Sequence, residues 1–210
     1  ANINSGGTLT TTNAGSDIAI TSGATTGAIA LAEDVTAVDR ITLTSNGTGN
    51  ITQTAGTLSA TNLQVTAVGN ATLNQATNDV DTLAADLNPG IFQYTDADGV
   101  EVGTVGTSGI ATGNGGNGGA VTINATSGTI NVTQSITTSP GTGGGISLSG
   151  AVTIGASLTA AGGTITLNGN TAATSDLDIN ADLVSDQPIV LTAPRDILVG
   201  ARIKTAAVTG

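Results

Sequence analysis

Pairs of aliphatic residues at positions i and i+2 recur along this sequence, and each pair is bounded by Gly, Asn, Ser or Asp. Residues at that spacing lie on the same face of a β-strand. In the second half, the aliphatics form four sets of three short strands, whose starts are separated by 25, 19 and 24 residues. The sets are Val121/Ile123, Ile130/Val132 and Ile136; Ile146/Leu148, Val152/Ile154 and Leu158; Ile165/Leu167, Leu177/Ile179 and Leu183; and Ile189/Leu191, Ile197/Val199 and Ile203.

The first half repeats this pattern more loosely, with starts separated by 23 and 22 residues. Its sets are Ile18/Ile20, Ile29/Leu31 and Val35; Ile41/Leu43, Ile51 and Leu58; and Leu63/Val65, Leu73 and Val80. Strands so short and close leave no room for crossover helices, which need about a dozen residues or more. We therefore predict an all-β chain that winds as a three-sided parallel β-solenoid, with roughly 19–25 residues per coil. The prediction is one solenoid domain over residues 1–210, a segment of a longer chain, with an irregular insertion at about 83–119.

Composition argues against a disordered linker and for an ordered chain. Glycine makes up 31 of 210 residues and charged residues 9%, as in a flexible linker, but 38% of the chain is hydrophobic. Disordered chains lack such residues because they cannot bury enough apolar surface to offset the entropy of ordering. Aromatic residues are limited to Phe92 and Tyr94, so we expect a core of stacked aliphatics. An antiparallel sandwich stays open as the other all-β fold.

Charge and residue type narrow the classes of function. The basic residues are Arg40, Arg195, Arg202 and Lys204, and the net charge is −11, which argues against binding nucleic acid or an anionic membrane surface. No run approaches the roughly 18 apolar residues of a membrane span. The chain has no histidine to serve as a catalytic base, and we interpret Lys204 as a solvated strand residue.

Two carboxylate pairs, Asp176/Asp178 and Asp79/Asp81, offer the two acids that a glycosidase needs. Because Leu177 and Ile179 are expected to point inward, Asp176 and Asp178 should point outward. The chain also lacks Trp, which commonly forms the platform for a sugar ring. We interpret both pairs as solvated strand faces and predict no catalytic residues and no enzyme activity.

Asp96-x-Asp98-Gly99 matches the start of a calcium-binding loop, but position 107, where that loop carries Glu, is Thr107. We interpret the motif as an Asp-Gly turn and predict no metal ligands and no cofactor, while calcium binding by Asp96 and Asp98 stays an open alternative. Threonine pairs raise a separate hypothesis of an ice- or surface-binding face. Examples are Thr42/Thr44, Thr52/Thr54 and Thr164/Thr166.

Three segments carry a resemblance to a known class of proteins. They are Asn78-Asp79-Val80-Asp81-Thr82-Leu83-Ala84; Phe92-Gln93-Tyr94-Thr95-Asp96-Ala97-Asp98-Gly99 with the following Val102-Gly103-Thr104-Val105-Gly106; and the Gly-Gly-x-aliphatic-Thr-aliphatic type at residues 163–167. In these segments the chain resembles the repeat region of large bacterial exoproteins of the filamentous haemagglutinin and autotransporter adhesin type. The resemblance implies a right-handed parallel β-helix, export across a Gram-negative envelope, and a role in adhesion, biofilm or cell-surface structure.

The expected function is a structural or adhesive segment of a secreted or cell-surface bacterial fibre. Residues 1–9 and 203–210 are typical of ordinary coil and not of a capping helix, so we expect contact with neighbouring coils of a longer chain or end-to-end self-association. A host or matrix ligand is a further possible partner. A carbohydrate-active β-helix enzyme and an ice- or surface-binding module remain the alternatives.

Overall fold

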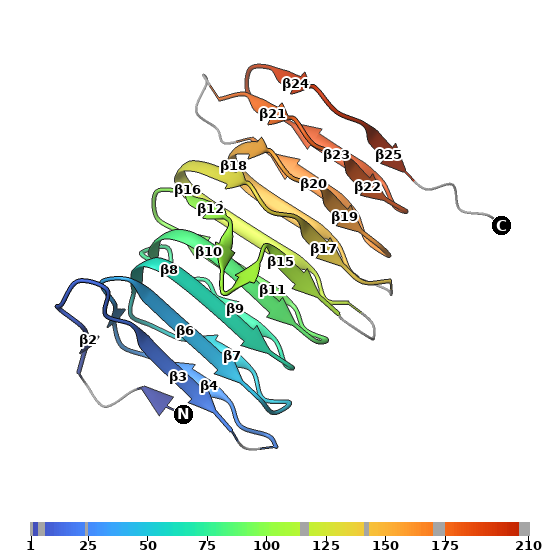
Figure 1. Cartoon of the computed structure of the whole chain (residues 1–210). Coiled ribbons are helices and arrows are strands. Elements are labelled where there is room, and N and C mark those ends of the chain that lie inside the picture. The colour runs from blue at the N-terminus through green and yellow to red at the C-terminus, as the bar shows by residue number, and fades with distance from the viewer. Residues whose placement is uncertain are drawn as a thin grey trace.

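The chain forms a β-solenoid of about eight turns in a computed structural model, which describes residues 2–3, 7–23, 25–113, 118–140, 143–169 and 175–205 (Figure 1). Successive coils lie one beside the next along a rod, and no helix occurs in the described ranges. The strands are β1 (Asn2–Ile3), β2 (Leu9–Thr10), β3 (Ile18–Ser22), β4 (Ile29–Leu31), β5 (Val35–Thr36), β6 (Arg40–Ser45), β7 (Ile51–Gln53), β8 (Leu58–Ala67), β9 (Ala71–Leu73), β10 (Asp79–Leu87), β11 (Phe92–Asp96), β12 (Val100–Val102), β13 (Thr104–Val105), β14 (Thr107–Ser108), β15 (Ile110–Thr112), β16 (Val121–Val132), β17 (Ile136–Thr138), β18 (Ile146–Ile154), β19 (Leu158–Ala160), β20 (Ile165–Asn168), β21 (Leu177–Ile179), β22 (Leu183–Ser185), β23 (Ile189–Thr192), β24 (Ile197–Val199) and β25 (Ile203–Thr205).

Each strand pairs in parallel with the strand that occupies the same side of the next coil. Face 1 is the column β1, β4, β7, β9, β11, the start of β16, the start of β18, β20 and β23. Face 2 contains β3, β6 and the ends of β8 and β10, and face 3 contains β2, β5 and the starts of β8 and β10. In the described residues the one antiparallel pair is β13 with β14. The parallel solenoid is therefore confirmed, and the antiparallel sandwich is excluded.

The predicted aliphatic rows form one continuous core. One row of face 1 begins with Ile29, Ile51, Ala71 and Phe92 and continues through Val121, Ile146 and Ile165, all of them at most 1% exposed. Each member stacks on the corresponding side chain one coil away, which buries apolar surface without large aromatic residues. All four strand sets predicted in the second half, at 121, 146, 165 and 189, coincide with strands of the structure.

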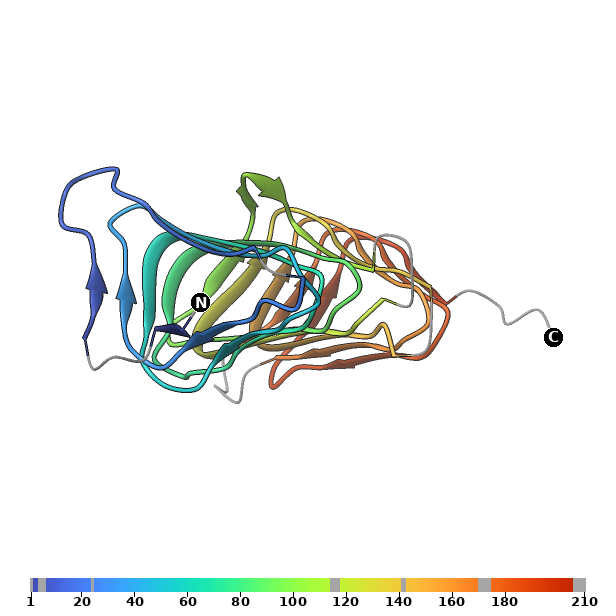
Figure 2. The same ribbon diagram turned by 90° about the horizontal axis from the view of Figure 1, so that it is seen from below.

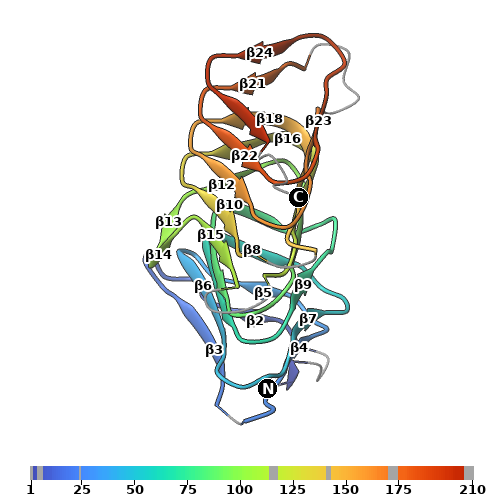
Figure 3. The same cartoon turned by 90° about the vertical axis from the view of Figure 1, so that its right-hand side faces the viewer.

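The cross-section changes at the coil that follows β10. On the side of the next coil, β10 pairs with two separate strands, β12 and β15. The antiparallel hairpin β13–β14 lies between these two strands (Figure 3). From that coil onward face 2 consists of two columns, one from β12 to β24 and one from β15 to β25, which we call faces 2a and 2b. Part of the predicted insertion at 83–119 is thus a regular coil that carries a hairpin, and residues 114–117 lie outside the described residues.

The hairpin packs against the outside of face 2 (Figure 2). Ala84 shares the outward register of Gln64, yet its side chain is 0% exposed, and Val105 in the hairpin is 5% exposed. Neither residue belongs to the internal core cluster. Gly106 turns the hairpin with φ of 70°, and a Cβ there would lie 2.5 Å from Oε1 of Gln64. The insertion therefore covers the outer surface of two earlier coils and leaves the internal rows unbroken.

Glycines stack at the corner that precedes face 1. A Cβ built on Gly119 would lie 2.1 Å from the carbonyl oxygen of Gly90, and a Cβ on Gly49 would lie 2.3 Å from that of Gly27. The spacing between paired strands leaves no room for a side chain that points along the rod. Glycine is therefore required here by close approach of the backbones and not by a positive φ.

We predict that Gly119→Ala destabilises the solenoid by about 1–3 kcal/mol, because the added methyl group forces two adjacent coils apart. Gly23→Ala is the matched control, since a Cβ at Gly23 meets no atom within 4 Å. Urea unfolding of both variants measures the difference. Equal stability of the two variants would contradict the close packing of this corner.

Candidate functional surfaces

Polar side chains inside the coil fix the glycine corner. Ser45 donates a hydrogen bond to the carbonyl oxygens of Gly27 and Gly49, each at 2.9 Å. Thr112 donates to Gly119 at 2.6 Å, and Ser185 donates to Gly163 at 2.7 Å. These hydroxyl residues occupy one inward register position at the end of faces 2 and 2b, and they satisfy carbonyl groups that the turn would otherwise leave unpaired.

A second buried polar cluster lies between face 1 and face 3. Asn78 is 0% exposed, and its amide exchanges two hydrogen bonds with Gln53 of the preceding coil, at 2.7 and 3.0 Å. Asn78 also accepts from the backbone N–H of Leu58 and donates to the carbonyl oxygens of Leu73 and Thr95. The two amides therefore link successive coils, and Gln53 occupies the inward position that Leu31 fills one coil earlier.

Asp96 extends this cluster at the coil where face 3 ends. Its carboxylate is buried and accepts from the hydroxyl of Tyr94 at 2.7 Å and from the backbone N–H of Val80 at 3.2 Å. It also accepts from the backbone N–H groups of Asp98 at 3.2 Å and Gly99 at 2.8 Å. Both carboxylate oxygens thus face hydrogen-bond donors. Val80 pairs with Ala60 of the preceding coil, and on its other side the Asp96 carboxylate takes the place of a strand in the next coil and closes the turn into β12.

This geometry favours the Asp-Gly turn over a calcium loop. A cation would have to displace N–H and O–H donors that already surround Asp96. Within the described ranges, no three carboxylate, His or Cys side chains converge in a way that could hold a metal ion. Burial raises the pKa of Asp96, while the Tyr94 hydroxyl and the backbone N–H groups oppose that rise. Burial and the adjacent carboxylate raise the pKa of Tyr94 well above its ordinary value, so its phenol keeps the proton that it donates.

The other carboxylates singled out in the sequence lie on the outside of the rod. Arg195 donates to both carboxylate oxygens of Asp176, and these bonds hold the pKa of Asp176 below its usual value. A depressed pKa is the opposite of what a general acid requires. Asp178 lies on the outward side of β21, and Asp79 and Asp81 are exposed on β10. The structure therefore places these four acids on outer strand surfaces, as expected.

Three ion pairs join adjacent coils in the same way. Arg40 lies 2.5 Å from Asp17, Arg195 pairs with Asp176, and Arg202 pairs with Asp182. Each arginine belongs to the coil after its aspartate, 19 to 23 residues later. The bonds from Arg202 hold the pKa of Asp182 below its usual value. Because the groups are solvated, these pairs add little stability but align charges along the rod.

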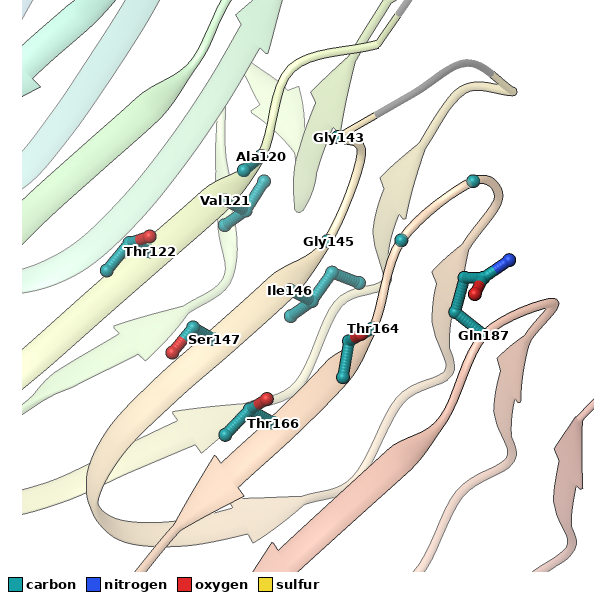
Figure 4. Close-up of a pocket in the computed structure, with 12 residues that line it drawn as sticks. Ala120, Val121, Thr122, Gly143, Gly145, Ile146, Ser147, Thr164, Thr166 and Gln187 are labelled. Atoms are coloured by element: carbon teal, nitrogen blue, oxygen red, sulfur yellow. The ribbon is translucent and has the colours of Figure 1, made fainter.

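Face 1 presents outward hydroxyl and amide side chains in two straight columns. One column contains Thr52, Thr72, Gln93, Thr122, Ser147 and Thr166, and the other contains Thr95, Asn124, Ser149, Asn168 and Thr192. A shallow groove of about 540 Å³ lies beside the first column, where Thr122, Ser147 and Thr166 follow one another on successive strands (Figure 4). Its lining combines hydroxyl side chains, glycines and Gln187 with the apolar residues Ala120, Val121 and Ile146, and it contains no charged side chain.

The last described coil leaves the core rows open. Ile197 is 42% exposed, Val199 is 51% and Ile203 is 42%, whereas Leu177, Ile179 and Leu183 directly before them are fully buried. In the described residues, β23, β24 and β25 pair on one edge only. The result is an apolar end surface bordered by unpaired N–H and C=O groups, which is the form of a site that accepts another strand layer.

We predict that Tyr94→Phe lowers the free energy of unfolding by about 1.5–3 kcal/mol at neutral pH, because the buried Asp96 carboxylate loses a charge-assisted hydrogen bond. The loss of that donor also raises the folded-state pKa of Asp96 further. An acid whose pKa is higher in the folded state loses stability as pH rises from its unfolded pKa to its folded pKa. The variant should therefore lose more stability between pH 4 and pH 7 than the natural chain does.

Urea unfolding at both pH values measures these changes, with Thr95→Ser as the control on the outward side of the same strand. If Tyr94→Phe is destabilised equally at pH 4 and pH 7, the hydrogen bond has no influence on the protonation of Asp96.

No family model, no curated protein and no solved structure matches the chain. No helix of sufficient length and apolarity to cross a bilayer occurs in the part of the chain that the structure describes.

Proposed function

We propose that this chain is a structural segment of an extended, extracellular β-solenoid rod, of the kind displayed on bacterial surfaces as adhesive fibres. The observation that carries the proposal is the open end of the last described coil. Its apolar rows at Ile197, Val199 and Ile203 keep the register of the columns that begin at β12 and β15. A further coil placed there would bury these side chains and pair the free edges of three strands.

The outer surface suits such a rod. Hydroxyl and amide side chains line face 1, and the net charge of −11 disfavours uncontrolled lateral association. Within the columns of face 1 and of faces 2a and 2b, each internal strand pairs with a strand on both sides, so a new strand can join these columns only at their ends. Added coils would therefore lengthen the rod along one axis, which is the geometry that a fibre requires.

The test adds one coil to the chain. Residues 206–210 are replaced by a second copy of residues 186–205, which enters in register because Thr205 already occupies the position of Ser185. We expect amide hydrogen exchange in β24 and β25 to slow by roughly tenfold or more, because both strands become internal layers.

The control carries the same added residues with every aliphatic moved by one position, which turns the apolar side chains outward. This control should leave exchange in β24 and β25 unchanged. Failure of the in-register copy to protect these strands would remove the support for a rod that continues beyond the open end.

A surface-binding module is a second candidate, because the columns of face 1 align hydroxyl groups over several coils. The carbohydrate-active alternative loses its best acid, since Asp176 is engaged by Arg195.

We expect the natural chain to depress the freezing point of water no more than its concentration dictates, because Gln93 and the asparagines interrupt the threonine pattern. A nanolitre osmometer measures this property. A larger depression that Thr122→Tyr on face 1 abolishes, and that Thr153→Tyr on face 2a preserves, would support the surface-binding module instead.

A further inference from the structure

We propose that Asn46 is a site of spontaneous covalent modification, at which the backbone nitrogen of Gly47 attacks the side-chain amide and leaves a carboxylate in its place. Four Asn-Gly dipeptides occur in the sequence. Glycine after asparagine leaves the attacking nitrogen unhindered and its backbone free to approach the side chain. Two of these dipeptides lie wholly within the described residues, Asn46 with Gly47 and Asn168 with Gly169. The reaction is independent of the proposed rod function.

The fold leaves the attacking nitrogen of Gly47 without a partner in the protein. Asn46 directly follows β6, and its own backbone N–H donates to the carbonyl oxygen of Ser22 at 3.0 Å. The backbone N–H of Thr48 donates to the carbonyl oxygen of Thr25 in the preceding coil, also at 3.0 Å. Between these two anchored residues, the N–H of Gly47 has no hydrogen-bond acceptor in the part of the chain that the structure describes. No intramolecular bond therefore has to break before this nitrogen loses its proton.

The side chain of Asn46 is also free to turn. It is exposed, and within the described ranges its amide makes no hydrogen bond. Two other asparagines near this corner are held in place. Oδ1 of Asn50 accepts from the backbone N–H of Asn70 at 2.9 Å, and Oδ1 of Asn70 accepts from that of Ile91 at 2.9 Å. The backbone N–H that follows each of these two asparagines also donates to the next coil. Of these three asparagines, Asn46 is thus the one whose amide can approach the next backbone nitrogen.

Asn168 with Gly169 provides the comparison within the same chain. Asn168 is also exposed, and both Gly47 and Gly169 are buried, so exposure does not distinguish the two sites. The backbone N–H of Gly169, however, donates to the carbonyl oxygen of Thr192 at 2.7 Å, and Asn168 is held between the strands β18 and β23. Attack by the Gly169 nitrogen requires that this hydrogen bond break first, which raises the barrier. The same dipeptide is therefore reactive at one site and protected at the other.

The reaction balances with water as its sole co-reactant. Hydroxide removes the proton of the Gly47 N–H, and the nitrogen attacks Cγ of Asn46. The bond between Cγ and Nδ2 breaks, and ammonia leaves with a proton taken from water, which restores the hydroxide and gives a succinimide ring. Water then opens the ring. Cleavage between Cγ and the Gly47 nitrogen gives aspartate, and cleavage between the main-chain carbonyl carbon of Asn46 and that nitrogen gives isoaspartate.

Both products place a negative charge at the corner after β6, and isoaspartate also lengthens the backbone by one carbon atom. That atom is inserted between Ser45 and Gly49. The hydroxyl of Ser45 donates to the carbonyl oxygens of Gly27 and Gly49, each at 2.9 Å. The isoaspartate form therefore disturbs the hydrogen bonds that fix the glycine corner, whereas the aspartate form leaves the backbone unaltered.

The test follows both sites in the folded chain. The purified protein is incubated at pH 8 and digested with pepsin in acid, where the reaction is slow, and the peptides are analysed by mass spectrometry. We expect Asn46 to convert roughly tenfold faster than Asn168, because only Asn168 depends on the loss of a hydrogen bond. In guanidinium chloride the two sites should convert at similar rates. At pH 6 Asn46 should convert more slowly than at pH 8, because fewer of the attacking nitrogens lose their proton.

Asn46→Gln is the matched control, because glutamine would have to close a larger ring, which forms more slowly. Its peptide should keep its mass while Asn168 converts as in the natural chain. Asn46→Asp carries the charge of the product on an unaltered backbone. Compared with this variant, the isoaspartate fraction, isolated by chromatography, should show faster amide hydrogen exchange at Thr48.

Two outcomes would overturn the proposal. The first is equal conversion of Asn46 and Asn168 in the folded chain, which would show that the hydrogen bond of Gly169 gives no protection. The second is conversion of Asn46 in guanidinium chloride alone, which would show that the fold protects this site as well. Neither result alters the coil-extension test, so the modification site can fail while the rod function stands.

Discussion

The stacking of each coil on the next through parallel backbone hydrogen bonds is the constraint on which the rest of the structure depends. Because paired strands keep their register, every position in a coil inherits the environment of the position one coil earlier. An inward position therefore holds an aliphatic residue in most coils, and close approach of two backbones at the corner before face 1 favours glycine in successive coils. The simple composition of the chain follows from this repetition, since few environments exist and each is used many times.

Polar side chains occupy the interior of the solenoid at the corners of a coil and at the place where the cross-section changes. Hydroxyl groups at the end of face 2 bind the carbonyl groups of the glycine corner, and Asn78 pairs with Gln53, which replaces an aliphatic residue in the row that contains Leu31. Asp96 lies where face 3 ends and supplies acceptors to backbone N–H groups that lose their strand partner. A buried polar group is tolerated at such a position because its hydrogen bonds are satisfied, and it restricts the place at which the cross-section can change.

The sequence predicts the apolar rows well because their signal repeats. The i, i+2 spacing of pairs such as Ile165/Leu167 identifies both the strands and the inward face, and the distance between sets gives the length of a coil. The inward polar residues escaped prediction because only aliphatics were counted. Gln53 follows Ile51 by two positions and Asp96 follows Tyr94 by two, so strand alternation alone places both side chains inside.

The hairpin β13–β14 could not be predicted for a different reason. Its one apolar anchor, Val105, packs on the outside of β10, and a contact between an insertion and an outer strand surface has no period to reveal it. The open end was expected from the absence of a capping pattern, whereas the pairing of Arg195 with Asp176 and of Arg202 with Asp182 becomes visible only once the fold brings adjacent coils together.

In a solenoid, most backbone N–H and C=O groups of the internal coils are already paired with the neighbouring coils. The outer sides and the terminal coil therefore differ in what they offer to a partner. The outer columns of face 1 carry uncharged hydroxyl groups in water, where a hydrogen bond to a ligand replaces one to solvent with little net gain. The terminal coil instead offers unpaired backbone groups beside exposed aliphatic rows, so that association there gains both strand pairing and apolar burial. This difference in free energy per contact is the reason that the proposed rod function places the next coil at the end of the rod and not on its side.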